Sequence, residues 1–152
     1  MSVPGKLRLV EEERTAEYRL DEQVGFILRK ANQRHLAIFA GKIADLTPPQ
    51  FAALAKLYEV GKTSQNQLGQ LIAMDAATIK GVIDRLKARR LVALTPHALD
   101  RRRLLVDLTA EGQEAVEKLL PLAREITEKT LAPLTPREAA TLVRLLSKLA
   151  ES

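Results

Sequence analysis

The sequence has 152 residues and no cysteine, with 46% hydrophobic and 28% charged residues, a formal net charge of +5 and a pI of about 9.7. This composition excludes a disordered chain, a disulfide framework and thiolate chemistry, and no apolar run is long enough to span a membrane. The first 20 residues lack the apolar core of a secretory signal, so we expect a cytoplasmic protein that forms one compact domain.

Helices are predicted over most of the chain. Residues 1–20 are predicted as an N-terminal arm, and residues 21–43 as a long helix with one apolar stripe. Three helices are predicted to begin at capping boxes, where a Ser or Thr accepts a backbone N–H and a Gln or Glu three residues later reaches back. These boxes are Thr47–Gln50, Ser64–Gln67 and Thr135–Glu138. Asp75 is placed to cap a further helix that runs to Arg89, and residues 110–131 predict a second long helix.

One interval of the sequence predicts strands. Residues 91–94 and 104–108 are short and apolar, and the loop between them contains Pro96, His97 and Asp100. This pattern is typical of a β-hairpin. The predicted fold class is therefore mostly α, with six helices and one small β-hairpin.

The spacing of two predicted helices indicates a helix–turn–helix motif. The helices that begin at Ser64 and Asp75 are separated only by a few residues around Ala73 and Met74. In this motif the second helix lies in the major groove of DNA and the first crosses the phosphate backbone. The predicted contact residues on the two helices are Ser64, Gln65, Asn66, Ala76, Ala77, Thr78, Lys80, Arg85 and Lys87.

Positive charge coincides with this motif. Residues 85–103 contain seven basic residues and one acidic residue, as expected of a surface that binds the phosphates of double-stranded DNA. An amphipathic helix pair whose charges simply face water remains an alternative at this point.

The hairpin resembles the wing of the MarR family of winged helix–turn–helix regulators. Asp100–Thr109 matches the family signature D-x-R-x-x-x-V-x-L-T, and Gly112 stands where the family usually has a glycine. Val82–Leu86 and Leu91–Val92 are similar to the recognition helix of that family and its exit. The similarity extends over residues 21–149.

The resemblance implies roles for the wing residues. Asp100 and Arg102 are expected to pair and shape the wing, while Arg101 and Arg103 enter the minor groove. Because side chains alternate along a strand, we expect Arg102 to point away from the other two arginines. The sequence departs from the family at Arg90, where a glycine commonly ends the recognition helix, and at the wing tip, residues 95–99, which lacks a glycine.

The resemblance also implies a homodimer that binds a palindromic operator. Residues 21–46 and 110–152 are predicted as dimerisation helices and residues 47–109 as the winged helix–turn–helix region. The terminal helices carry more apolar residues than so thin a fold can bury. These residues are Val24, Ile27, Leu28, Ala31, Leu131, Leu134, Leu142, Leu145, Leu146 and Leu149. The alternative is that they close a monomeric core.

A small-molecule effector is a further implication. Residues 20–36 are similar to those of relatives that sense aromatic acids or their CoA thioesters. Arg29 or Arg34 would then receive a carboxylate, His35 would bond a ring substituent and Phe39 would stack on the ring. For His35, the alternative is a satisfied histidine in a core or interface.

The sequence therefore predicts a transcriptional regulator, by family default a repressor released by its ligand, with no cofactor, no metal and no membrane partner. An enzyme is not expected, because there are only two histidines and no Gly-rich phosphate loop, H-E-x-x-H or nucleophile-elbow motif. A non-specific architectural DNA-binding protein without an effector is the alternative that shares the basic surface.

Overall fold

The computed structural model describes residues 17–152, so most of the predicted N-terminal arm lies outside the described residues. The described residues fall into two units, which divide between His35 and Leu36. The first contains a 3-10 helix, η1 (Leu20–Glu22), and the beginning of α2 (Val24–Lys42), which continues into the second. The predicted long helix is confirmed, with its first turn replaced by the 3-10 turn.

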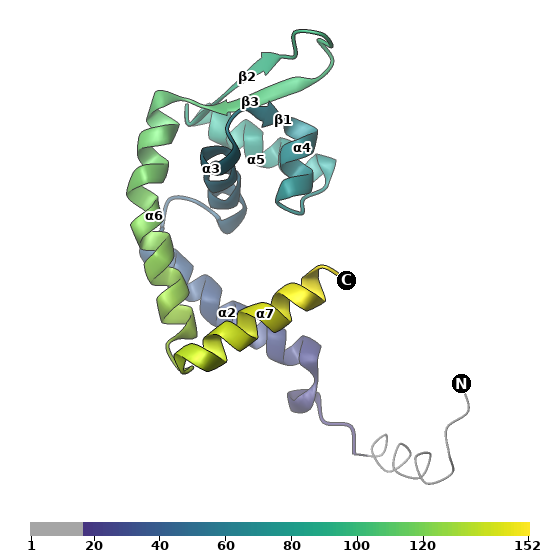
Figure 1. The fold of residues 1–152 in the computed structure, drawn as a ribbon, viewed down its shortest axis with the longest axis vertical. Coiled ribbons are helices and arrows are strands. Elements are labelled where there is room, and N and C mark those ends of the chain that lie inside the picture. The colour runs from purple at the N-terminus through teal and green to yellow at the C-terminus, as the bar shows by residue number, and fades with distance from the viewer. Residues whose placement is uncertain (1–16) are drawn as a thin grey trace, which may run out of the picture. The chain divides into compact units, whose positions relative to one another are not determined.

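The second unit contains the other helices and all of the described strands (Figure 1). The described residues form six α-helices in total, as predicted. The remaining elements are α3 (Pro48–Val60), β1 (Thr63–Ser64), α4 (Gln65–Leu71), α5 (Ala76–Ala88), β2 (Val92–Pro96), β3 (Leu104–Leu108), α6 (Ala110–Leu131) and α7 (Pro136–Ala150). None of the described helices is long and apolar enough to cross a membrane.

The predicted caps account for where the helices begin. Both halves of the capping box form at Thr47 and at Thr135, and the carboxylate of Asp75 accepts the backbone N–H of Thr78 at 2.7 Å. Only one half forms at Ser64, whose hydroxyl accepts the N–H of Gln67 at 3.1 Å. Ser64 is also the last residue of β1, where it pairs with Leu105.

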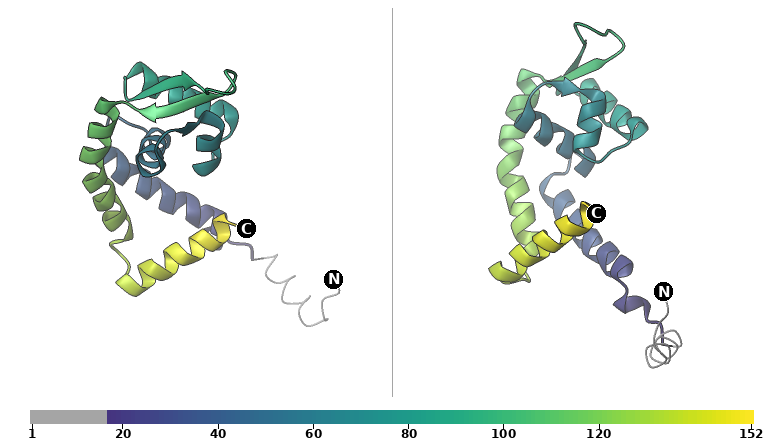
Figure 2. Two further views of the ribbon diagram at one scale, coloured as in Figure 1. Left: turned by 45° about the horizontal axis from the view of Figure 1, so that its top comes forward. Right: turned by 45° about the vertical axis from the view of Figure 1, so that its right-hand side comes forward.

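The strands form a three-stranded antiparallel sheet in the order β1-β3-β2. The predicted hairpin is confirmed, with a register from Val92 opposite Leu108 to Pro96 opposite Leu104. The third strand, β1, is a finding that the sequence did not predict. The loop at the end of the hairpin extends beyond the helices of this unit (Figure 2).

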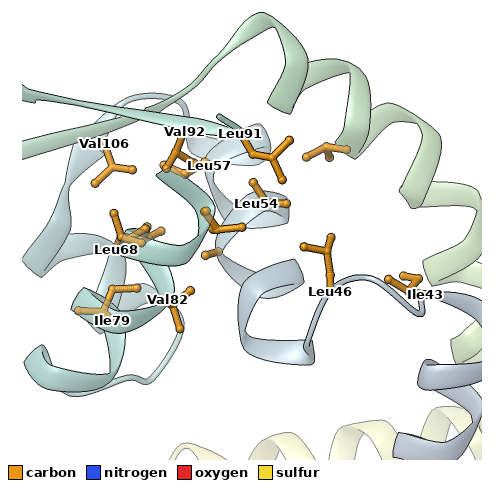
Figure 3. Packing of buried hydrophobic residues seen from close by; sticks show 14 of the residues in the cluster. Ile43, Leu46, Leu54, Leu57, Leu68, Ile79, Val82, Leu91, Val92 and Val106 are labelled. Carbon is orange, nitrogen blue, oxygen red and sulfur yellow. The ribbon is translucent and has the colours of Figure 1, made fainter. Parts of the chain in front are cut away.

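The hydrophobic core holds α3, α4 and α5 against the sheet (Figure 3). Leu54, Leu68, Ile83 and Val106 come from four different elements and are completely buried. Each such side chain stabilises the fold by about 1.5–3 kcal/mol relative to an exposed one. All four residues of α5 that the periodicity placed inward are buried. The opposite face of α5 therefore lies toward solvent.

Candidate DNA-binding surface

The turn between α4 and α5 brings the two helices into close contact. Ala73 adopts a left-handed φ of 57°, and the N–H of Met74 donates to the carbonyl of Gly69 at 2.8 Å. A Cβ on Gly69 would lie 3.0 Å from the carbonyl oxygen of Met74 and 3.2 Å from the side chain of Ile79. A side chain at position 69 would therefore push these neighbours apart by a few tenths of an ångström, so glycine favours the close approach of the two helices of the predicted helix–turn–helix.

The exposed face of α5 carries the residues predicted to read DNA. Small side chains occupy its first turn, which permits a close approach of a partner, and basic side chains occupy its last turn. The predicted contact residues Ala76, Ala77, Thr78, Lys80, Arg85 and Lys87 are all exposed. The backbone N–H of Thr78 stabilises the carboxylate of Asp75 and holds the pKa of that carboxyl below its usual value.

Lys80 has a partner that the sequence analysis did not assign. Its ammonium lies 2.9 Å from the carboxylate of Asp84, one helical turn away, and its side chain is 67% exposed. Pairs of this kind contribute only a few tenths of a kcal/mol. The ammonium of Lys80 can therefore leave Asp84 for a phosphate or a base at little cost.

The start of α4 lies beside the wing. Ser64 is buried and its hydroxyl caps the helix, whereas Asn66 is exposed. A hollow of about 100 Å³ is lined by residues from both regions. They are Ser64, Gln65, Asn66, Arg102, Arg103 and Leu104. The structure thus brings the predicted contact residues of α4 and two of the wing arginines to one surface.

A larger hollow, of about 370 Å³, adjoins the exposed face of α5. Thr78, Gly81 and Arg85 line it on the α5 side, and Thr47, Pro49 and Gln50 at the start of α3 line it on the other. The sequence did not indicate that the start of α3 lies beside the recognition helix. Its only signal there was a capping box, which reports a helix start and not its surroundings.

The wing loop contains the ion pair expected from the resemblance. The guanidinium Nε of Arg102 lies 3.6 Å from the carboxylate of Asp100, which also accepts the backbone N–H of Arg102 at 3.1 Å. However, β3 begins at Leu104, so Arg101, Arg102 and Arg103 lie in the turn and not on the strand. Strand alternation therefore gives no basis for the direction of these side chains, and the side chain of Arg102 is 95% exposed.

The exit of the recognition helix is strained at Arg90, the position where the family commonly has a glycine. Arg90 has a φ of 61°, a left-handed conformation that side chains disfavour. Four hydrogen bonds surround it: Arg90 N–H to Lys87 O at 2.9 Å, Leu91 N–H to Leu86 O at 3.0 Å, Thr109 Oγ1 to Arg90 O at 2.6 Å and Thr109 N–H to Leu91 O at 3.1 Å. These bonds hold the turn in place despite its strain.

Two contacts connect distant parts of the second unit. The guanidinium of Arg89, just after α5, donates to the carbonyl of Asp45 at 2.6 Å and to its carboxylate at 3.1 Å. Lys42 pairs with Glu125 of α6 at 2.9 Å, which raises the pKa of Lys42 and lowers that of Glu125. The sequence showed neither pair, because residues 44 or more positions apart leave no local pattern.

The predicted effector residues fall in both units. Arg29, Arg34 and His35 lie on the part of α2 that belongs to the first unit, where Arg29 and Lys30 both approach the ring of Phe26 at 5.6 Å. Phe39 belongs to the second unit and is only 6% exposed. Its ring packs edge-on against Phe51, with centroids 6.1 Å apart, so it is part of the core. Within residues 17–152, His, Asp and Glu side chains form no group of three that would hold a metal ion.

Comparison with known proteins places these features in a family. Residues 44–103, which contain the helix–turn–helix and most of the wing, match the model of the MarR family. The chain is 43% identical to the HTH-type transcriptional repressor NicR of Pseudomonas putida over 137 residues, which cover 89% of this chain and 87% of NicR. The chain belongs to the MarR family. It is therefore a DNA-binding transcriptional regulator of the winged helix–turn–helix class and not an enzyme.

Solved structures of other regulators have the same fold as this MarR-family chain. A probable transcriptional regulator from Pseudomonas aeruginosa is 54% identical, with a TM-score of 0.84 over 86% of this chain and 99% of that one. BpsR of Bordetella bronchiseptica is 43% identical, with a TM-score of 0.85 over 89% of this chain and 98% of that one. That structure is described as showing how 6-hydroxynicotinic acid regulates DNA binding by BpsR. The predicted six-helix winged fold is therefore confirmed for nearly the whole chain.

Proposed function

We propose that this MarR-family regulator is a homodimeric repressor that binds a palindromic operator and is released by a small aromatic carboxylic acid. The observation that carries the proposal is the 43% identity, over most of each chain, to a transcriptional repressor and to a regulator controlled by 6-hydroxynicotinic acid. An aromatic acyl-CoA is the alternative ligand, since it presents a similar ring. As a regulator of transcription, the protein would act in the cytoplasm.

The exposed apolar face of α7 supports the dimer. No residue of α7 is buried, and its leucines are 38–63% exposed, a large apolar surface for a lone chain. In the first unit, Val24, Ile27 and Leu28 are also 43–66% exposed. Removing apolar surface from water contributes about 25 cal/mol per Å². A second copy of the chain would cover these faces, as expected for the predicted dimerisation helices.

The proposed DNA contacts divide into two kinds. The exposed first half of α5, from Ala76 to Lys80, would face base edges in the major groove, where each good pairing discriminates by about 1–3 kcal/mol. Gln65, Asn66, Arg85 and Lys87 would contact phosphates. Arg101 and Arg103 would contact the minor groove and the phosphates that flank it. Ser64 would contribute through its cap, because its hydroxyl already accepts the N–H of Gln67.

Arginines of α2 are the proposed receptors of the effector carboxylate. A guanidinium offers paired N–H donors that match a carboxylate, and Arg29 and Arg34 are both exposed. His35 would bond a ring substituent. Phe39, the fourth predicted effector residue, belongs to the second unit, where its ring packs on Phe51. The ligand would act by binding one arrangement of the recognition helices more tightly than the other.

The experiment locates the operator by footprinting DNA upstream of the gene and of its neighbours, and then measures binding by fluorescence anisotropy. We expect one palindrome to bind at least about a thousandfold more tightly than random DNA. The complex is then titrated with 6-hydroxynicotinate, with benzoyl-CoA, and with 6-hydroxynicotinamide as a matched control that lacks the carboxylate. The acid should release the DNA and the amide should not.

Three outcomes would contradict the proposal in separate ways. Equal affinity for the palindrome and for random DNA would favour an architectural protein over a repressor. If the protein binds the palindrome specifically and neither an aromatic acid nor an acyl-CoA alters the binding, the proposed effector is wrong but the proposed repressor stands. If benzoyl-CoA releases the DNA and the acid does not, the effector is an aromatic acyl-CoA and not an aromatic carboxylic acid.

Variants then test the receptor. Arg29→Met and Arg34→Met should bind the operator like the wild type but require at least tenfold more acid for release, since a charged hydrogen bond contributes about 1.5–3 kcal/mol. Lys30→Met is the matched control, because it removes a neighbouring cation that is not assigned to the ligand. An equal effect of all three variants would indicate a general charge effect and no specific receptor.

A further inference from the structure

The tip of the wing displays a leucine almost completely to solvent. Leu99 is 92% exposed, whereas no other large apolar side chain among residues 17–152 exceeds 66%. A single exposed leucine is common on protein surfaces and needs no explanation by itself. What distinguishes Leu99 is its place in the loop between β2 and β3, directly before Asp100 and the three wing arginines.

The loop around Leu99 is held by its own hydrogen bonds. The backbone N–H of Leu99 donates to Nδ1 of His97 at 3.1 Å, and the N–H of His97 donates to the carbonyl of Arg103 at 2.8 Å. The N–H of Arg103 donates to the carbonyl of Asp100 at 3.0 Å. The bonds connect both sides of the loop, so the leucine is presented by a defined backbone.

The charge around Leu99 indicates which kind of partner the loop would bind. Arg101, Arg102 and Arg103 give the loop three cations against the single carboxylate of Asp100. A loop of this charge is attracted to a polyanion. It would bring the apolar tip to the surface of a duplex, because Leu99 and the arginines lie within five consecutive residues.

We propose that Leu99 enters the minor groove of the operator and packs against its deoxyribose walls while the neighbouring arginines bind phosphates. This inference rests on the proposed operator binding and adds an apolar contact to it. Leucine is among the side chains that proteins insert into minor grooves. It has no hydrogen-bonding group, so it reads the shape of the groove and disfavours the amino group that guanine projects into it.

Apolar contacts and phosphate contacts affect the salt dependence of DNA affinity differently. Neutralising a phosphate releases counterions, and each such contact adds about 0.9 to the slope of log K against log salt concentration. Leu99 carries no charge, so its removal should lower the affinity at every salt concentration without changing the slope. Loss of Arg101 should instead reduce the slope.

The test compares Leu99→Ser with Ala98→Ser, a matched change at the exposed neighbouring residue. Anisotropy is measured on the operator at several salt concentrations. We expect Leu99→Ser to weaken binding about tenfold for each bound wing, with an unchanged slope, given the usual value of burying a leucine. Ala98→Ser should stay within about twofold of the wild type. Both positions are exposed, so neither change threatens folding.

A modified operator locates the contact. Replacing adenines beneath the wing with 2,6-diaminopurine adds an amino group to the minor groove and leaves the major-groove pattern unchanged. We expect this change to weaken the wild type and to affect Leu99→Ser much less. Equal sensitivity of the two proteins would place Leu99 outside the groove and overturn the proposal.

The remaining outcomes are also decisive. If the wild type binds its operator specifically and Leu99→Ser binds equally well, the proposal is overturned while the proposed function stands. A change of oligomeric state with unchanged DNA affinity would assign Leu99 to a protein contact and overturn the proposal as well. A wild type that binds no operator would overturn the proposed function, and the inference with it.

Discussion

Gly112→Ala should destabilise the protein, because it places a methyl group at the crowded junction between the recognition-helix exit and α6. Gly112 is the third residue of α6, and a Cβ there would overlap the carbonyl oxygen of Leu91 and lie 2.9 Å from its carbonyl carbon. The oxygen cannot move away freely, since it accepts the N–H of Thr109 at 3.1 Å. The side chain of Leu108, 3.3 Å from the same position, closes another side.

The expected cost follows from these contacts. Displacing the carbonyl of Leu91 loses a hydrogen bond of about 1 kcal/mol, and overpacking costs about 1–3 kcal/mol more. Alanine recovers at most about 1 kcal/mol over glycine in a helix. The net loss in the free energy of unfolding is therefore about 1–3 kcal/mol, which corresponds to a fall of roughly 1 M in the urea midpoint.

Urea denaturation at one fixed protein concentration measures this loss, because association of two chains would make the stability depend on concentration. Gly41→Ala is the matched control. Gly41 lies inside α2, and a Cβ there meets nothing within 4 Å, so this change should stabilise the protein by up to about 1 kcal/mol. A Gly112→Ala protein as stable as the wild type would refute the argument from close approach.

Three further changes test other parts of the molecule. Arg90→Gly should stabilise the protein by up to about 1 kcal/mol, because glycine relieves the φ of 61°, and a lower urea midpoint would contradict this. Asp75→Ala should lower the urea midpoint at pH 7. The pKa of Asp75 is depressed in the folded state, so its carboxylate stabilises the fold above the unfolded pKa. The difference in urea midpoint between the wild type and Asp75→Ala should therefore shrink as the pH falls below about 4. A difference that does not depend on pH would argue against the cap. Arg101→Ala combined with Arg103→Ala should flatten the salt dependence of operator binding by about 0.9 per lost phosphate contact, and an unchanged slope would remove both arginines from the contact surface.

Local signals explain the parts of the fold that the sequence predicted. The boxes at Thr47 and Thr135 and the cap at Asp75 act within three residues, so each is visible in the sequence and present in the structure. The buried stripe of α5 likewise follows from helical periodicity. The exposed recognition face is the complement of that stripe, which is why its residues were predictable.

The missed features depend on contacts between distant residues. The strand β1 has two residues, too few for any period, and exists because it pairs with β3. The pair between Arg89 and Asp45 joins residues 44 positions apart.

The spacing of the two half-sites offers the most direct test of the central claim, that two recognition helices of one dimer enter successive major grooves. Anisotropy is measured on the natural operator and on versions with roughly 5 or 10 base pairs inserted at its centre. Because half a helical turn moves the second groove to the opposite face of the duplex, we expect the 5-base-pair insertion to reduce affinity to that of a single half-site. Equal affinity for the natural operator and for the 5-base-pair insertion would contradict the account.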